Sequence, residues 1–179
     1  ADVNHNSSYI DEINNKEWVA ILPGSKKAKL SIGIPFFLEV ADHIKECEEN
    51  INLMIPLAPT TELKDFIFFQ SDKNPISKYY SSHIKSINKI ENSIFDYVLE
   101  TCKNTKIFIL NQSSNHNILS QCKLALTTVG ANTAELAAIN LPMLVVLPTQ
   151  HLNAMNAWDG IFGIIGKITL LNRVQTFII

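Results

Sequence analysis

Cysteine is scarce in this chain, which contains Cys47, Cys102 and Cys122 and no others. These residues are far apart and form no C-x-x-C pair, so we expect reduced thiols and neither a disulfide framework nor a cysteine-based zinc site. The histidines are also scattered, with no two at the spacing of metal ligands on a helix. The sequence therefore predicts no metal and no cofactor.

An excess of positive charge is also missing. The net charge is −2, so the chain lacks the broad basic surface that binds nucleic acid. Few aromatic residues stand among the basic ones, which argues against a platform on which single-stranded bases could stack. We therefore predict that nucleic acid is not a partner of this protein.

Long hydrophobic runs and familiar catalytic motifs are absent too. No apolar run reaches the ~20 residues that a membrane-spanning helix needs, and the polar beginning of the chain does not resemble a signal peptide. Neither a G-x-S-x-G motif nor a Cys/His pair for nucleophilic catalysis is recognisable. These observations favour a cytoplasmic protein and exclude the common hydrolase signatures.

The chain is nevertheless apolar enough to fold. Apolar residues make up 46% of its 179 residues, which suits one globular domain with a real core. We expect a polar linker or arm at residues 1–16, a domain at residues 17–160 and an apolar tail at residues 161–179. Since the tail ends on Phe-Ile-Ile, we expect a piece of a longer protein; the tail would face a membrane or a missing part of that protein.

Strand-like and helical segments alternate along the domain. We predict strands at residues 18–22, 51–57, 124–128 and 141–147, and helices at about 30–47, 59–69, 116–121, 132–139 and 152–158. Residues 71–90 should be mostly loop, and residues 95–110 either a hairpin or a helix followed by one strand. This alternation predicts an α/β fold, a parallel sheet with helices on both faces, which binds ligands beyond the carboxyl ends of its strands.

The most informative segment runs from Leu126 to Ala137, where a strand, a glycine turn and a helix follow one another. Gly130 allows a tight turn close to a ligand, and the helix after it offers free N–H groups and a positive dipole end to a phosphate. Glu135, one turn inside the helix, could accept hydrogen bonds from two ribose hydroxyls. The alternative is an ordinary turn, with Thr133 as a helix cap and Glu135 as an acid that complements the dipole.

Two further loops are predicted at the same edge of the sheet. Gly24, Ser25 and Lys26 follow the first strand, where they could meet a diphosphate; the alternative is a solvated basic turn. Gln150 and Asn153 follow the last predicted strand, and their amides could bind sugar hydroxyls or a phosphate; the alternative is helix capping. The first loop matches neither a Walker motif nor G-x-G-x-x-G.

The order and spacing of these segments resemble the lipid-A-disaccharide synthases. Residues 21–30, Ile-Leu-Pro-Gly-Ser-Lys-Lys-Ala-Lys-Leu, resemble the Leu-Leu-Pro-Gly-Ser-Arg segment of that family. Residues 129–135, Val-Gly-Ala-Asn-Thr-Ala-Glu, resemble its Ser-Gly-Thr-Ala-Thr-Leu-Glu, and residues 141–146 resemble its Val-Pro-Met-Val-Val. The resemblance covers about residues 17–160, with little to compare in residues 71–105.

This resemblance implies the C-terminal, donor-binding half of a GT-B glycosyltransferase, a class with two Rossmann-like domains and an active site between them. The implied donor is UDP-N-acetylglucosamine, bound without a metal. By the same resemblance, Glu135 takes the ribose hydroxyls, and Gln150 and Asn153 lie near the phosphate or the sugar. The residues implied at the diphosphate are Gly24, Ser25, Lys26, Gly130, Ala131, Asn132 and Thr133.

The resemblance also implies partners outside this chain. The acceptor-binding domain and its general base would precede it, so no catalytic residue is expected here and the piece should turn nothing over alone. The resemblance also implies that the protein acts at an inner-membrane lipid surface.

The sequence departs from the family at the glycine turn. Val129 replaces a Ser, which removes a hydroxyl near the phosphate, and Ala131 and Asn132 stand where Thr and Ala are usual. A second hypothesis is therefore a degenerate transferase domain that acts as a membrane-associated binding or scaffolding module. A third is a nucleotide-sugar epimerase of the same fold, although no acid–base residues for that reaction can be identified.

Overall fold

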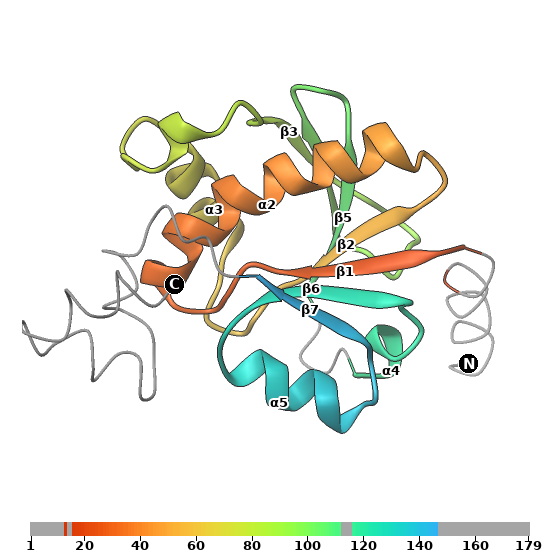
Figure 1. The fold of residues 1–179 in the computed structure, drawn as a ribbon. Coiled ribbons are helices and arrows are strands. Elements are labelled where there is room, and N and C mark those ends of the chain that lie inside the picture. The colour runs from red at the N-terminus through yellow and green to blue at the C-terminus, as the bar shows by residue number, and fades with distance from the viewer. Residues whose placement is uncertain (1–12, 14–15, 112–115, 147–179) are drawn as a thin grey trace, which may run out of the picture.

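A computed structural model describes residues 13, 16–111 and 116–146 of the chain (Figure 1). The larger part of the predicted domain therefore lies within the described residues. Three predicted segments lie wholly or mostly outside them: the arm at residues 1–16, the helix at 152–158 and the tail at 161–179.

The described strands form one seven-stranded sheet in the order β3-β4-β5-β2-β1-β6-β7. Five adjacent strands, β5, β2, β1, β6 and β7, run parallel to one another, whereas β4 runs antiparallel to both β3 and β5. This is the predicted Rossmann-like α/β arrangement, with an antiparallel extension at one edge. The strands are β1 (Trp18–Leu22), β2 (Asn52–Pro56), β3 (Ile84–Lys89), β4 (Tyr97–Thr101), β5 (Lys106–Leu110), β6 (Leu124–Thr128) and β7 (Met143–Val146).

Helices cover both faces of the sheet, as predicted (Figure 1). α2 (Lys27–Cys47) and α3 (Leu63–Gln70) lie on one face, and α4 (His116–Leu119) and α5 (Ala131–Ala138) lie on the other. A short 3₁₀ helix, η1 (Ser77–Tyr79), follows α3. None of the described helices is long and apolar enough to cross a membrane.

Strand β1 lies in the middle of the core and is buried along its whole length. Val19 and Ile21 pack in the cluster beneath α2 and α3. Trp18 points to the opposite face, where its ring lies 4.9 Å from that of Phe95, centroid to centroid. Burial on both faces explains why this strand is apolar throughout rather than alternating.

Helix α2 begins earlier than the predicted start at about Leu30, so Pro35 lies inside it rather than in its first turn. Proline has no N–H, which leaves the carbonyl of Ser31, four residues earlier, without its helical donor. The side chain of Asn74 supplies that donor, with 2.7 Å between its Nδ2 and the Ser31 oxygen. Asn74, which is distant in sequence, thus supplies the hydrogen bond that Pro35 cannot donate.

Residues 71–90 are mostly loop, as predicted, but they also contain strand β3, which the prediction missed. A register shift between Ile84 and Ser86 interrupts the pairing of β3 with β4. Such a bulge lets Ile84 and Ile87, which are not an even number of residues apart, both pack against the same hydrophobic cluster. The alternation expected of a strand was therefore not visible in the sequence. For residues 95–110 the structure selects the hairpin, β4 and β5.

Helix α3 begins later than the predicted start at about residue 59, at Leu63. Its N-cap is Glu62, whose N–H donates to the Asp65 carboxylate at 2.9 Å. The hydroxyl of Thr60 instead donates to the Ser25 carbonyl at 3.2 Å. Thr60 therefore supports the turn after β1 rather than a helix end.

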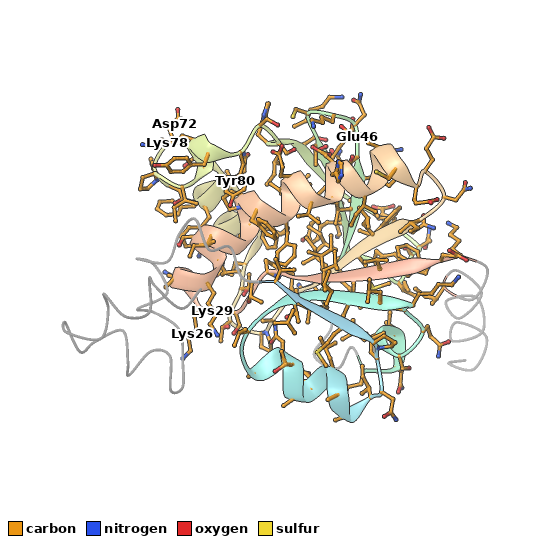
Figure 2. The ribbon with its side chains drawn as sticks, in the orientation of Figure 1. Lys26, Lys29, Glu46, Asp72, Lys78 and Tyr80 are labelled. Carbon is orange, nitrogen blue, oxygen red and sulfur yellow. The ribbon has the colours of Figure 1, made fainter. Side chains whose placement is uncertain are left out.

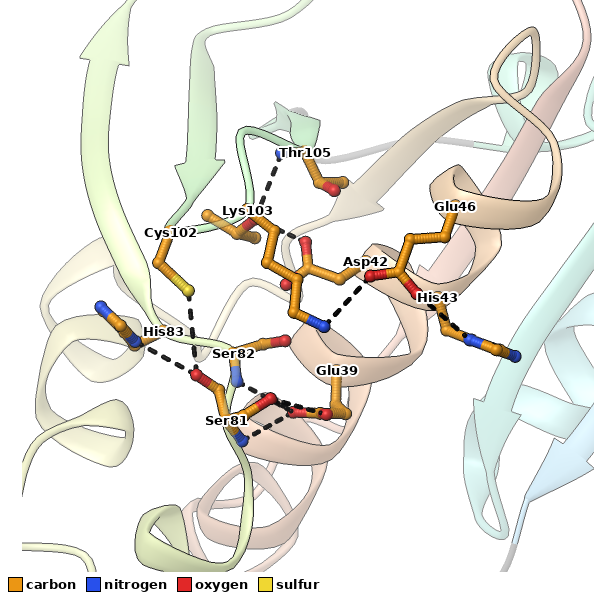
Figure 3. A network of polar contacts seen from close by, with 11 residues as sticks. Glu39, Asp42, His43, Glu46, Ser81, Ser82, His83, Cys102, Lys103 and Thr105 are labelled. Carbon is orange, nitrogen blue, oxygen red and sulfur yellow. Dashed lines mark hydrogen bonds and ion pairs between the residues drawn. The ribbon is translucent and has the colours of Figure 1, made fainter.

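A polar network ties α2 to the segment that precedes β3 (Figure 3). The Glu39 carboxylate accepts hydrogen bonds from the backbone N–H groups of Ser81, at 2.7 Å, and Ser82, at 2.8 Å. One turn further along α2, the buried Asp42 accepts a hydrogen bond from the hydroxyl of Thr101, at the end of β4. These contacts hold the antiparallel edge of the sheet against the long helix.

Candidate functional site

Two glycine turns leave the sheet side by side. β1 and β6 are parallel neighbours, with Leu22 paired to Thr127, so the turns that follow them emerge at the same edge. Since β2 lies on one side of β1 and β6 on the other, this is where the strand order reverses. Ligands of open α/β sheets bind at such a point. The structure thus brings together the two predicted diphosphate segments, residues 24–26 and 130–133.

Each turn leads into a helix whose positive end is not neutralised by an acid. Lys26 is the N-cap of α2, and Gly130 is the N-cap of α5. Neither helix has a side-chain hydrogen bond at its cap or an acidic residue in its first turn. The unpaired N–H groups and the dipoles of both helices favour an anion at this edge.

Lys29, which is not among the predicted site residues, connects the two turns. Its side chain is buried, with 7% of its surface exposed, and its Nζ donates to the Val129 carbonyl at 3.2 Å. Figure 2 shows Lys26 and Lys29 at the beginning of α2, where α5 also begins. Because the predicted helix starts at about Leu30, Lys29 is predicted in the loop before it. In the structure α2 begins at Lys27, so Lys29 lies in its first turn and is buried.

Both glycines lie directly against Lys29. A Cβ on Gly130 would lie 2.6 Å from the Lys29 Nζ, and one on Gly24 would lie 2.7 Å from the Lys29 Cβ. The two glycines also have positive φ values, 156° and 115°, which other residues rarely adopt. Their small size therefore serves the close approach of a lysine as well as the turn.

Glu135 is paired with a residue that the sequence analysis overlooked. Its Oε1 lies 2.7 Å from the Nε2 of His116, the first residue of α4, and about half of each side chain is exposed, 49% and 51%. No lysine or arginine of the described residues pairs with this carboxylate. Glu135 therefore remains accessible to a ligand, oriented by a histidine from the neighbouring helix.

The positions of the remaining predicted site residues give less support to a ligand site. Thr133 uses its hydroxyl to donate to the Gly130 carbonyl at 2.7 Å, so it stiffens the turn. Ala131 is exposed and Asn132 is half-buried, both in the first turn of α5. Gln150 and Asn153 lie outside the described residues.

Other parts of the described chain offer less for this chemistry. A polar pocket of about 610 Å³ lies at the amino ends of β1 and β2, the edge opposite to the glycine turns. Within the described ranges, no group of three or more His, Cys, Asp and Glu side chains could hold a metal ion. The lining of the pocket consists of Lys16, Glu17, Glu48, Asn50, Ile51 and Asn52.

The fold and the paired turns define an α/β protein of Rossmann-like architecture with an anion-favouring edge. Among curated proteins, the chain is similar to a lipid-A-disaccharide synthase of Aeromonas hydrophila subsp. hydrophila, with 28% identity over 61 residues. The match covers 34% of this chain and 16% of the length of that protein. It indicates a distant relationship and supports the resemblance in part. No protein-family model matches the chain.

Proposed function

We propose that this chain is the donor-binding half of an N-acetylglucosaminyltransferase and holds UDP-N-acetylglucosamine at the paired glycine turns. One observation carries the proposal: the turns after β1 and β6 lie together at the switch point of the sheet, each opening a helix with an uncapped positive end. The partial match to a lipid-A-disaccharide synthase supports the same assignment.

The proposed contacts follow the chemistry of the donor. The diphosphate is received by the backbone N–H groups of residues 24–26 and 130–132, and Glu135 accepts hydrogen bonds from the ribose hydroxyls. Because His116 contacts one oxygen of Glu135, the other oxygen of that carboxylate is the better placed acceptor. Gln150 and Asn153 complete the proposed site near the phosphate or the sugar.

In the proposed reaction, a hydroxyl of the acceptor attacks the anomeric carbon of the sugar, and the bond from that carbon to the diphosphate oxygen breaks. Negative charge develops on the leaving diphosphate. Helix N-termini and fixed N–H groups stabilise such a charge without having to reorganise. The general base comes from an acceptor-binding domain outside this chain, so we expect no transfer by the chain alone. We place the complete enzyme in the cytoplasm, at an inner-membrane lipid surface.

Calorimetric titration with UDP and UDP-N-acetylglucosamine tests the proposal. The wild type should bind both, and Glu135→Ala should bind UDP at least about tenfold more weakly, because hydrogen bonds to a charged group are lost. Glu46→Ala is the matched control, since Glu46 is also a helical acid paired with a histidine, His43, at 3.5 Å, but lies far from the turns (Figure 2).

Three outcomes would each contradict a different part of the proposal. Unchanged UDP affinity in Glu135→Ala would contradict the assignment of the ribose site. A wild type that binds neither compound would contradict the donor-binding function and favour the binding or scaffolding module instead. Sugar transfer by the isolated chain would contradict the expectation that the general base lies elsewhere.

A further inference from the structure

Among the residues that the structure describes, no acid lies beside the buried ammonium group of Lys29. Within the described residues its only hydrogen bond goes to the Val129 carbonyl at 3.2 Å, and no carboxylate forms an ion pair with it. The salt bridges of the described residues involve other cations, among them Lys64, Lys85 and Lys103. An ammonium group in this position is unusual because buried charges are normally paired.

The hydrogen-bonding capacity of Lys29 is also largely unused. An ammonium group has three N–H donors, and the structure gives a partner to one of them. The Nζ lies against Gly130, at the position that a side chain on the N-cap of α5 would occupy. The ammonium group and the positive end of α5 therefore lie together, and both favour the binding of an anion.

We infer that Lys29 is the resident cation of the diphosphate site and pairs with the phosphate groups of the bound nucleoside diphosphate. This inference rests on the proposed function and adds a residue to it. The two remaining N–H groups of Lys29 donate to phosphate oxygens, and the charge of the ammonium offsets the charge that develops as the diphosphate leaves. Lys26, which the sequence analysis selected, is exposed and is the less effective cation of the two.

A purely structural role makes a different prediction. If Lys29 only tethered the first turn of α2 to the end of β6, its replacement would lower stability and leave ligand affinity intact. If it is a ligand-binding cation, its unpaired charge is a cost to the free protein, and an apolar side chain of similar length relieves that cost. Binding sites commonly retain such a conflict between stability and function.

The experiment compares Lys29→Met with Lys27→Met, an exposed lysine on the same turn of α2. UDP and inorganic pyrophosphate are titrated by calorimetry, and melting temperatures are recorded with and without UDP. We expect Lys29→Met to weaken the binding of both probes by about ten- to a hundredfold, the equivalent of one or two charge-assisted hydrogen bonds. Lys27→Met should bind within about twofold of the wild type. The free Lys29→Met chain should melt no lower than the wild type.

The failures can be separated. If the wild type binds UDP and Lys29→Met binds it equally well, this inference is wrong while the proposed function stands; if the wild type binds neither probe, the proposed function itself fails. If Lys29→Met does not fold, the wild type is labelled with ¹³C-lysine and studied by NMR. The Lys29 signal is assigned as the one that is missing from Lys29→Arg. Pyrophosphate should shift the ε-methylene resonance of Lys29, and an unmoved resonance in a chain that binds pyrophosphate would overturn the inference.

Discussion

The Nε2 atom of His116 lies 2.7 Å from the Oε1 atom of Glu135, so the first residue of α4 orients the acid of α5. We predict that His116→Ala weakens UDP binding about two- to fivefold, the equivalent of one modest hydrogen bond, and that Glu135→Gln weakens it more. Because His116 acts through Glu135, the double variant should bind no worse than Glu135→Gln alone. Calorimetry on the four proteins measures the coupling, and simple additivity of the two losses would show that His116 acts independently.

Asn74 should be more important for stability than a loop residue normally is. Its buried side chain donates to the Ser31 carbonyl, which Pro35 leaves without a helical donor. We predict that Asn74→Ala lowers the free energy of unfolding by about 1–3 kcal/mol, the cost of an unsatisfied buried polar group. Urea denaturation gives this value, and Asn88→Ala, which removes an exposed amide, is the control.

The same explanation predicts a rescue. In the Asn74→Ala background, Pro35→Ala restores an N–H that can donate to the Ser31 carbonyl within α2. The double variant should therefore recover part of the loss caused by Asn74→Ala. If it recovers nothing, the repair of the helix by Asn74 is not the reason for its effect.

Gly33 should not tolerate a methyl group. A Cβ at this position would lie 2.1 Å from the carbonyl oxygen of Pro23, which is backbone and cannot move aside alone. We predict that Gly33→Ala lowers the free energy of unfolding by at least about 1–3 kcal/mol and, because the Pro23 turn must shift, weakens UDP binding as well. Urea denaturation and calorimetry measure the two effects. Ser31→Ala, on the same helix, is the control and should leave both nearly unchanged, since its hydroxyl bonds only within α2.

Acid should loosen the edge of the sheet that Glu39 holds. Burial raises the pKa of Glu39, but hydrogen bonds from Ser82 and Ser81 outweigh burial and bring the pKa below its ordinary value of 4.5. Because the pKa is lower in the folded chain, the contribution of Glu39 is fully present above pH 4.5 and is lost as the pH falls through the folded value.

Urea midpoints recorded between about pH 7 and pH 3 test this linkage. The wild type should lose more stability below pH 4.5 than Glu39→Gln does, whereas Glu91→Gln, which changes an exposed acid, should follow the wild type. Parallel curves for all three proteins would rule out Glu39 as a source of the pH dependence.

The cysteines should differ sharply in reactivity. Burial raises the pKa of Cys122 to about 12, whereas Cys47 is exposed. At about pH 8, a disulfide reagent such as dithionitrobenzoate should modify Cys47 within minutes and Cys122 only as fast as the chain unfolds. Peptide mass spectrometry identifies the modified residue, and Cys47→Ser removes the part of the fast labelling that belongs to Cys47, since Cys102 is partly exposed as well. Rapid labelling of Cys122 in the folded chain would contradict its burial.

Much of the architecture was predictable because its signals are local. The continuous apolar run of β1, the helical spacing of α2 and the glycine turn before α5 each lie within about 20 residues, and each appears in the structure close to its expected position. The strand that was missed, β3, is the exception that supports this explanation. Its bulge lets Ile84 and Ile87 share a face, so that its pattern depends on pairing with β4 and not on its own sequence.

The candidate site was predictable only in part. Gly24 and Gly130 could be selected because glycine adopts turn conformations that other residues rarely adopt. The two turns lie at the same edge of the sheet, as predicted. Lys29 and His116 could not be selected in the same way. The burial of Lys29 depends on β6 lying next to β1, and the contact of His116 with Glu135 depends on α4 lying next to α5.

The amino-acid sequence by itself determined most of the strands, helices and tight turns, because backbone preferences and hydrophobic periodicity act over a few residues. The tertiary structure alone decided that a lysine from the first turn of α2 lies against the N-cap of α5, with no acid of the described part of the chain beside it. Residues 29 and 130 are far apart along the chain, and the free energy that brings them together comes from the burial of the whole sheet rather than from any local pattern.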